Sequence, residues 1–150
     1  MKALDLAKYI ICISHENKSP ISNLQLQKVL YFVNMFYIAK TNNPLIDDDF
    51  EAWQFGPVIK EVYNEYSING SNKIYLEKDE NYAKIDKAVD AETKEMIIAL
   101  SKASVWKLVD YSHRKNGPWD KTFDEKDPYK RDVINYEFIK DEALKIFQSN

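Results

Sequence analysis

Residues 24–32 read LQLQKVLYF, and residues 50–63 read FEAWQFGPVIKEVY. The first stretch predicts the start of a broadly buried helix, because apolar side chains occupy more than one face of it. The second predicts a short extended piece, a Gly56-Pro57 corner and a new helix. Pro57 suits the first position of that helix, where its missing N–H costs nothing. Neither stretch holds a catalytic motif, so both are used first to predict the fold.

Further helices are predicted on both sides of these stretches. Apolar periodicity predicts helices over residues 3–15, 22–40, 90–102, 104–113 and 135–147. The expected capping residues of the last four are Ser22 or Asn23, Asp90, Ser104 and Asn135. A second short strand is expected at residues 73–76, a mobile loop at residues 77–87 and irregular structure at residues 114–132. The expected fold class is therefore mostly α, a single compact domain over residues 1–150 with about six helices and one or two short β-strands.

Composition restricts the functional classes. The 150 residues are 45% hydrophobic, enough for one domain to fold without a disulfide or a metal. The net charge is −3, from 21 basic and 24 acidic residues that alternate along the chain, so direct nucleic-acid binding is not expected. Cys12 is the only cysteine, which indicates a reducing compartment. The apolar run at residues 4–13 is too short to span a membrane, so a cytoplasmic protein is expected.

Few residues are candidates for chemistry. Cys12 lies between two isoleucines, as a buried and inert thiol would. Neither histidine has a second ligand at metal-binding spacing, and the chain holds no glycine-rich phosphate loop, so no metal or cofactor is expected. Two interpretations of His113 stay open. It could be an acid–base group that works with Tyr111 or Asp110 in a small hydrolase or transferase. It could also be a half-buried residue whose ring nitrogens hold the following loop through backbone hydrogen bonds.

Two polar residues interrupt the apolar start of the helix at residues 22–40. Gln27 is expected to hydrogen-bond the backbone of residues 53–57. Lys28 is either a second buried anchor or a side chain that carries its charge to the surface over apolar carbons. Trp53 is expected to pack in the core rather than to hold a ligand.

Aromatic residues make up 13% of the chain and include ten tyrosines. Tyrosine suits a partner-binding face, although it could also replace phenylalanine in the core. Trp106 is the first candidate for a partner contact, because Val105, Leu108 and Val109 form the predicted core stripe of its helix. The candidate partner contacts are Trp106, Tyr111, His113, Trp119, Tyr63 and Tyr66.

These motifs together resemble the Panacea domain, the family of SocA-like antitoxins and the related GepA-like phage-associated proteins. The matching residues are LQKVLYF at 26–32, with Gln27, Lys28 and Tyr31; FEAW at 50–53, with Trp53; FGPV at 55–58, with Gly56 and Pro57; Val62-Tyr63; Leu108; Ser112-His113; Pro118-Trp119; Ile134 and the closing helix to Phe147. Ser112 stands where the family more often has threonine. Residues 77–87 match no family pattern. No appended helix-turn-helix domain is recognised in this sequence, so DNA-binding autoregulation by this chain alone is not expected.

The resemblance implies a mostly helical antitoxin that neutralises a cognate toxin, usually encoded beside it, by direct binding. Its SocA type is an adaptor that delivers the toxin to an AAA+ protease. The family offers no catalytic residues, so the chain is not expected to be an enzyme. An alternative is a phage-derived protein that binds a host factor.

Overall fold

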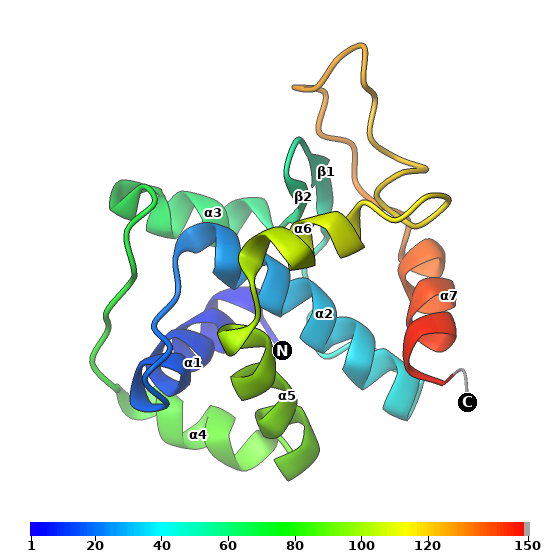
Figure 1. Cartoon of the computed structure of the whole chain (residues 1–150). Helices are drawn as coiled ribbons and strands as arrows, with labels where there is room; N and C mark the ends of the chain where they lie inside the picture. Colours follow the sequence, from blue (N-terminus) through cyan, green and yellow to red (C-terminus); the bar gives the residue numbers. More distant parts are fainter. Residues whose placement is uncertain (149–150) are drawn as a thin grey trace.

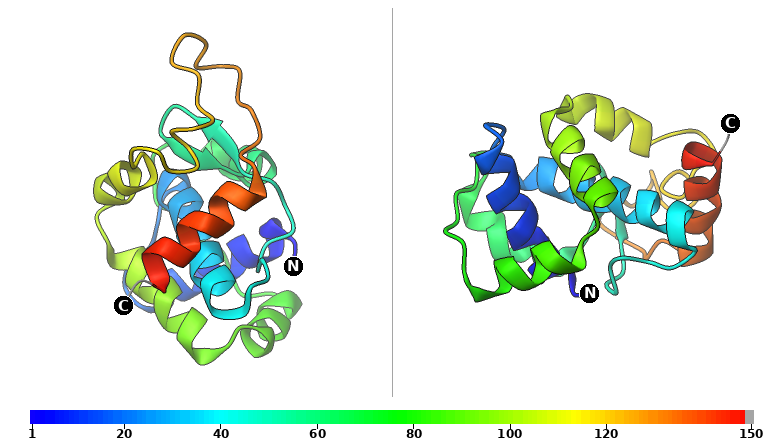
Figure 2. Two further views of the ribbon diagram at one scale, coloured as in Figure 1. Left: turned by 90° about the vertical axis from the view of Figure 1, so that its right-hand side faces the viewer. Right: turned by 90° about the horizontal axis from the view of Figure 1, so that it is seen from below.

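Helix α2 (Asn23–Thr41) runs through the middle of the fold, and the other elements pack around it (Figures 1 and 2). The structure is a computed structural model, which describes residues 1–148. The expected mostly α class is confirmed, with seven α-helices where about six were expected. The other elements are α1 (Ala3–Glu16), β1 (Glu51–Trp53), β2 (Gly56–Val58), α3 (Lys60–Tyr66), the 3-10 turn η1 (Ser67–Asn69), α4 (Glu80–Ala88), α5 (Ala91–Lys102), α6 (Val105–Ser112) and α7 (Tyr136–Phe147).

Local sequence explains where α2 begins and ends. The Ser22 hydroxyl accepts a hydrogen bond from the Gln25 N–H, and the Gln25 side chain accepts one from the Ser22 N–H, which forms a capping box. Asn42 ends the helix in the left-handed conformation. Between these ends the helix is buried on almost every side and packs against α1, α5, α6 and α7. Burial against several neighbours is what the wide apolar surface predicted.

The hairpin β1–β2 corrects the prediction for the second stretch. Gly56 and Pro57 do not form the corner; they lie in β2, where Trp53 pairs with Gly56 and Ala52 with Pro57. The two residues between the strands, at positions 54–55, make the turn. Helix α3 then begins at Lys60 rather than at Pro57. Proline is tolerated here because an edge position need not donate a ladder hydrogen bond.

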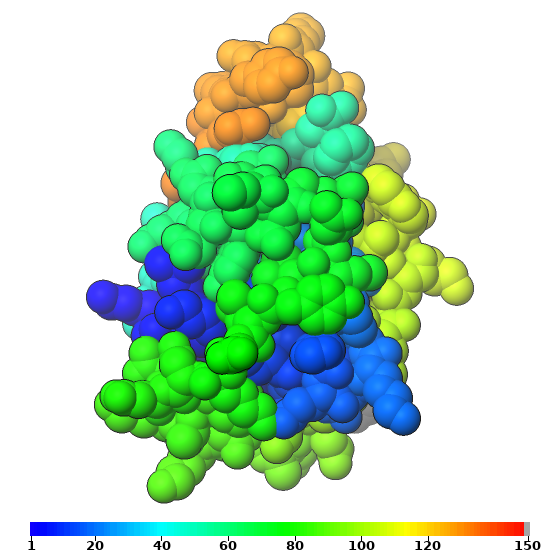
Figure 3. Space-filling model, turned by 90° about the vertical axis from the view of Figure 1, so that its left-hand side faces the viewer, coloured from blue at the N-terminus to red at the C-terminus, as the bar shows by residue number. Residues whose placement is uncertain are grey.

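Three local predictions after the hairpin were also wrong. Residues 73–76 are extended but form no strand; Ile74 donates one backbone hydrogen bond to the Ile21 carbonyl. Helix α4 occupies most of the expected loop at 77–87, and the Asp79 side chain caps it. Ser104 stands at the start of α6, but its side chain makes no capping hydrogen bond. Figure 3 shows the chain between α3 and α4 crossing one face of the molecule over the N-terminal residues.

Contacts made by α1 explain why α4 forms and why the Cys12 thiol is inert. The rings of Tyr9 and Tyr82 lie 5.1 Å apart, and the Tyr9 hydroxyl donates a hydrogen bond to Asp86 at 2.7 Å. Cys12 is buried as predicted, its sulfur lies 3.6 Å from the Leu76 carbonyl oxygen, and burial raises the pKa of its thiol. A thiol with a raised pKa is a poor nucleophile, which agrees with an inert cysteine.

Residues 120–132, which we call the arm, project from the helices beside the hairpin (Figure 2). Irregular structure was expected here and is confirmed. The arm returns to the hairpin, where the Ala52 N–H donates to the Asp132 carbonyl at 2.9 Å and the Ile134 N–H donates to the Phe50 carbonyl at 2.8 Å. Asn135 then caps α7 as predicted, by accepting from the Glu137 N–H. Over residues 1–148, no helix has the length and apolar character needed to cross a membrane.

Candidate partner-binding site

The polar residues at the start of α2 lie beneath the hairpin. Lys28 is fully buried, and its Nζ donates a hydrogen bond to the Pro57 carbonyl oxygen at 2.8 Å. Gly56 has a φ of +110°, and a Cβ there would lie 2.7 Å from Lys28 Cε. Burial lowers the pKa of Lys28 to about 7. Lys28 is therefore a buried anchor for the hairpin, and the alternative that its charge reaches the surface is wrong.

Gln27, Trp119 and Tyr31 complete this buried unit. Gln27 Oε1 accepts a hydrogen bond from the Ile59 N–H at 3.0 Å, two residues beyond the predicted segment 53–57. The indole N–H of Trp119 donates to the Trp53 carbonyl at 2.6 Å. Tyr31 is also buried, among the aromatic residues beside the hairpin. The residues that carry the family resemblance thus hold the hairpin on α2, which is a structural role.

His113 follows α6 and packs flat against Trp119, with ring centroids 3.7 Å apart and an interplanar angle of 9°. Its Nε2 is buried and has no hydrogen-bond partner among residues 1–148. Burial lowers the pKa of His113, and the charge of nearby Lys28 lowers it further. The expected backbone hydrogen bond is absent at this nitrogen, so the ring holds the following loop by stacking. A buried nitrogen without an orienting partner is poorly suited to acid–base catalysis.

Replacing His113 with phenylalanine is expected to keep the free energy of unfolding at pH 7 within about 1 kcal/mol of wild type, or to raise it. The replacement keeps a stacked ring and removes an unpaired buried polar atom. It should also reduce the loss of stability in acid. The pKa of His113 is lower in the folded protein than in the unfolded chain, so the unfolded chain takes up the proton more readily. Wild-type stability therefore falls as the pH drops below about 6.5. Urea unfolding at pH 7 and pH 5 measures both effects.

The control is His113→Ala, which removes the stack and should destabilise the protein at both pH values. A phenylalanine variant as unstable at pH 7 as the alanine variant would show that the imidazole nitrogens are essential to the fold.

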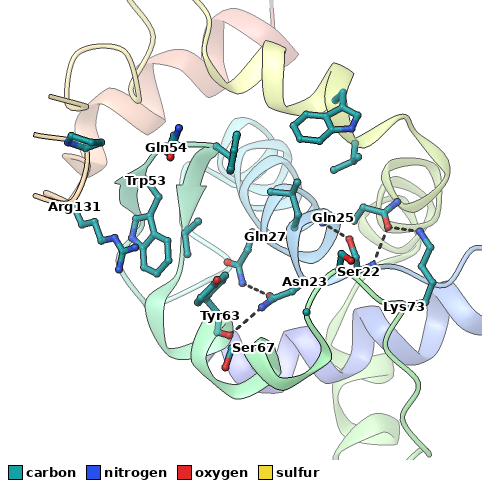
Figure 4. A pocket seen from close by; sticks show the side chains of 18 of the residues that line it. Ser22, Asn23, Gln25, Gln27, Trp53, Gln54, Tyr63, Ser67, Lys73 and Arg131 are labelled. Carbon is teal, nitrogen blue, oxygen red and sulfur yellow. Dashed lines mark hydrogen bonds between the residues drawn. The ribbon is translucent and has the colours of Figure 1, made fainter. Parts of the chain in front are cut away.

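A groove of about 640 Å³ opens beside the hairpin (Figure 4). Its walls come from the first turns of α2, the hairpin turn, α3, residues 67–73, the start of α6 and residues 128–131 of the arm. Segments far apart in the sequence meet here because the arm returns to β1. The groove is larger than a hollow of about 340 Å³ beside Phe50 and one of about 130 Å³ beside Cys12, which makes it the leading candidate for a binding site.

Five aromatic side chains are among the residues that line the groove. Trp53 and Tyr63 pack with ring centroids 4.8 Å apart, and Phe55 and Trp106 lie 6.0 Å apart in an edge-to-face pair. Half or more of the surface of the latter two is exposed, 50% for Phe55 and 57% for Trp106. Tyr129 on the arm is 78% exposed. Aromatic residues left in water around a concave surface are typical of partner-binding sites.

The charged side chains that line the groove are both basic. Lys73 and Arg131 are the charged residues among those that line it, and none of the described lining residues is acidic. The Arg131 guanidinium lies 3.7 Å from the centroid of the Trp53 ring. Lys73 donates a hydrogen bond to Gln25 at 2.7 Å, beside the N-terminus of α2, where the helix dipole is positive. This lining contrasts with the net charge of −3 of the whole chain.

The structure brings together only some of the predicted contact residues. Trp106 and Tyr63 line the groove, and the exposure predicted for Trp106 is confirmed. Tyr111 is about half exposed but packs on Phe32 outside the groove lining. Trp119 and Tyr66 are buried, so in this conformation they offer no surface to a partner.

Sequence reasoning missed Phe55, Lys73, Tyr129 and Arg131. Arg131 is one of two arginines in the chain and follows Tyr129 closely, an aromatic and arginine pairing that is enriched at interfaces. That composition could have indicated the arm. Trp53 is buried as expected, yet its ring also forms part of the groove wall. Within residues 1–148, no cluster of histidine, cysteine, aspartate and glutamate is arranged to hold a metal ion.

Comparison with known proteins assigns the chain to a family. Residues 26–120 match the family model described as "Antitoxin SocA-like, Panacea domain". The chain is similar to Antitoxin SocA of Caulobacter vibrioides (strain NA1000 / CB15N), with 35% identity over 111 residues, which cover 67% of this chain and 59% of that protein. No solved structure matches the chain. The family match includes the hairpin and its buried anchors Gln27, Lys28 and Trp119, and on this evidence the chain belongs to the SocA-like antitoxin family of Panacea-domain proteins.

Proposed function

We propose that this protein is an antitoxin that neutralises a cognate toxin by binding directly to it, without catalysis. The observation that carries this proposal is membership of the SocA-like antitoxin family over residues 26–120. The chain spans about 59% of the length of the curated relative that it matches, so the partner and mode of action enter here as part of the proposal.

The described surface supports protein capture. The groove is lined by exposed aromatic residues and an arginine, and tryptophan, tyrosine and arginine are enriched among the residues that dominate binding energy in protein interfaces. The one histidine considered as a catalyst has a buried and unpaired Nε2. The proposed compartment is the cytoplasm, where the buried free thiol of Cys12 would stay reduced.

The test is co-expression with the protein encoded next to this one. Induction of the neighbouring product alone is expected to stop growth, and this protein is expected to restore it. The two proteins should also co-elute at near equal stoichiometry in size-exclusion chromatography. A neighbouring product that is harmless and forms no complex would contradict the proposal. A stable complex with a host protein in place of a toxin would favour the phage-derived alternative.

Toxin levels distinguish two mechanisms. If the protein acts as an adaptor to an AAA+ protease, rescue should be accompanied by loss of the toxin and should fail in a strain without that protease. If the protein acts by occlusion, rescue should persist in that strain with the toxin level unchanged. Immunoblots of the toxin in both strains measure the difference.

A further inference from the structure

We infer that the groove beside the hairpin binds an acidic segment of the toxin that carries an aromatic or aliphatic anchor. This inference rests on the proposed function, because it names the part of the toxin that the groove would take. The proposed occupant is a peptide segment that has a carboxylate on each side of an apolar side chain.

The apolar anchor follows from the aromatic walls. Phe55 and Trp106 come from the hairpin turn and the start of α6, and their rings meet across 6.0 Å while half or more of each side chain stays in water. Tyr63 packs on Trp53 at the α3 side of the groove. An apolar side chain that packs against the exposed surfaces of these rings would remove both its own surface and theirs from water.

The carboxylates follow from the positive charges. Figure 4 shows Arg131 and Lys73 at opposite ends of the groove. The stack on Trp53 uses the face of the Arg131 guanidinium and leaves its in-plane N–H donors for a carboxylate. Lys73 stands beside the N-terminus of α2, which also favours a negative group. None of the described lining residues is acidic, so no carboxylate of the lining neutralises these two charges, and the groove atom that Lys73 bonds is the neutral amide oxygen of Gln25.

A protein segment fits these features better than a nucleic acid does. A nucleic-acid groove neutralises many phosphates with a row of basic residues, whereas this lining holds two cationic side chains on a chain of net charge −3. A volume of about 640 Å³ accepts a few side chains of one segment. The exposed rim at Tyr129 leaves room for the rest of the partner to continue past the groove.

The first test reverses the two charges. Arg131→Glu with Lys73→Glu is expected to weaken binding to the neighbouring gene's toxin by about 30-fold or more, the scale of an interface hot spot. Both side chains are exposed, so the fold should be unaffected. The matched control is Lys84→Glu with Lys87→Glu on α4, which makes the same change in net charge on exposed residues outside the groove. The control should bind within about threefold of wild type in isothermal titration calorimetry.

The second test removes the aromatic pair. Phe55→Ala with Trp106→Ala is expected to weaken binding by about 30-fold or more. Tyr75→Ala is the control, because Tyr75 is 60% exposed and does not line the groove. Circular dichroism melts confirm that each variant is folded before its affinity is compared.

The third test identifies the segment. Fluorescent 15-residue peptides that tile the toxin are titrated with wild type, and the peptides that bind should carry aspartate or glutamate around an aromatic or aliphatic residue. Their binding should be lost in the Arg131→Glu, Lys73→Glu variant. Basic peptides that bind in the groove, or a labelled single-stranded 12-mer DNA that binds there and displaces the toxin, would overturn the inference.

The outcomes separate two failures. If wild type neither binds nor neutralises the toxin, the proposed function fails and the inference fails with it. If wild type binds the toxin and both groove variants bind as tightly as their controls, the antitoxin role stands and only the inference about the groove is overturned.

Discussion

Replacing Gly56 with alanine is expected to lower the free energy of unfolding by about 3 kcal/mol. Two costs add at this position. The φ of +110° is a conformation that L-residues rarely adopt. The new methyl group would also lie 2.7 Å from both Lys28 Cε and Ser112 Oγ, and neither side chain can retreat because both are buried. Urea denaturation of the purified variant measures the loss.

Gly70→Ala is the matched control for this substitution. Gly70 also has a positive φ, of +57°, but nothing lies within 4 Å of the position its Cβ would take. Gly70→Ala should therefore lose only the cost of the strained backbone, at φ +57° and ψ −128°, and so less stability than Gly56→Ala. Equal losses in the two variants would show that the close approach to Lys28 contributes nothing to stability.

Replacing Lys28 with methionine is expected to change how stability depends on pH. The folded pKa of Lys28 is lowered to about 7, whereas the unfolded chain keeps a value near 10.4. Between these pH values the Lys28 amine is protonated in the unfolded chain but not in the folded protein, so the stability of wild type increases as the pH rises. Below pH 7 the folded protein also carries the charge, and the cost of burying it is fully present. Wild type should therefore gain about 3 kcal/mol relative to the variant between pH 7 and pH 9.5.

The comparison isolates Lys28 between pH 7 and pH 9.5, because His113, whose pKa the Lys28 charge lowers, is mainly neutral over this range in both proteins. The raised pKa values of Tyr9 and Tyr31 keep these residues neutral in the folded state throughout this range. Lys84→Met, at an exposed site on α4, is the control and should show the pH dependence of wild type. Parallel stability curves for wild type and Lys28→Met would contradict a buried lysine with a lowered pKa. Urea unfolding at half-unit pH steps provides the curves.

Helices with local signals could be predicted from the sequence. Asp90 and Asn135 cap α5 and α7 as expected, because a capping side chain bonds an amide two or three residues away. Helix α4 could not be predicted in this way, since its support from Tyr9 comes from α1, more than 70 residues earlier. The hairpin was misjudged because a Gly-Pro pair suits a turn and a helix start as well as an edge strand, and only the pairing with β1 decides.

The site was predictable only where one helix face defines it. Trp106 could be placed at the surface from the apolar spacing of its own helix, and the structure confirms that placement. Phe55 and Arg131 belong to a turn and an irregular segment, which have no periodicity to indicate direction. Their proximity depends on the backbone hydrogen bonds between β1 and the end of the arm, which no local pattern reveals.

The attachment of the arm affects how the binding surface of such a protein can evolve. Its base is tied to the hairpin on both sides, by the indole of Trp119 and by the carbonyl of Asp132, so residues 124–131 form a closed loop outside the core. Doubling the length of a flexible loop adds only about 0.6 kcal/mol of closure entropy. Insertions and substitutions there would reshape one rim of the groove while the buried lysine and its hairpin stay as they are. New binding preferences can therefore arise in this loop at little cost to folding.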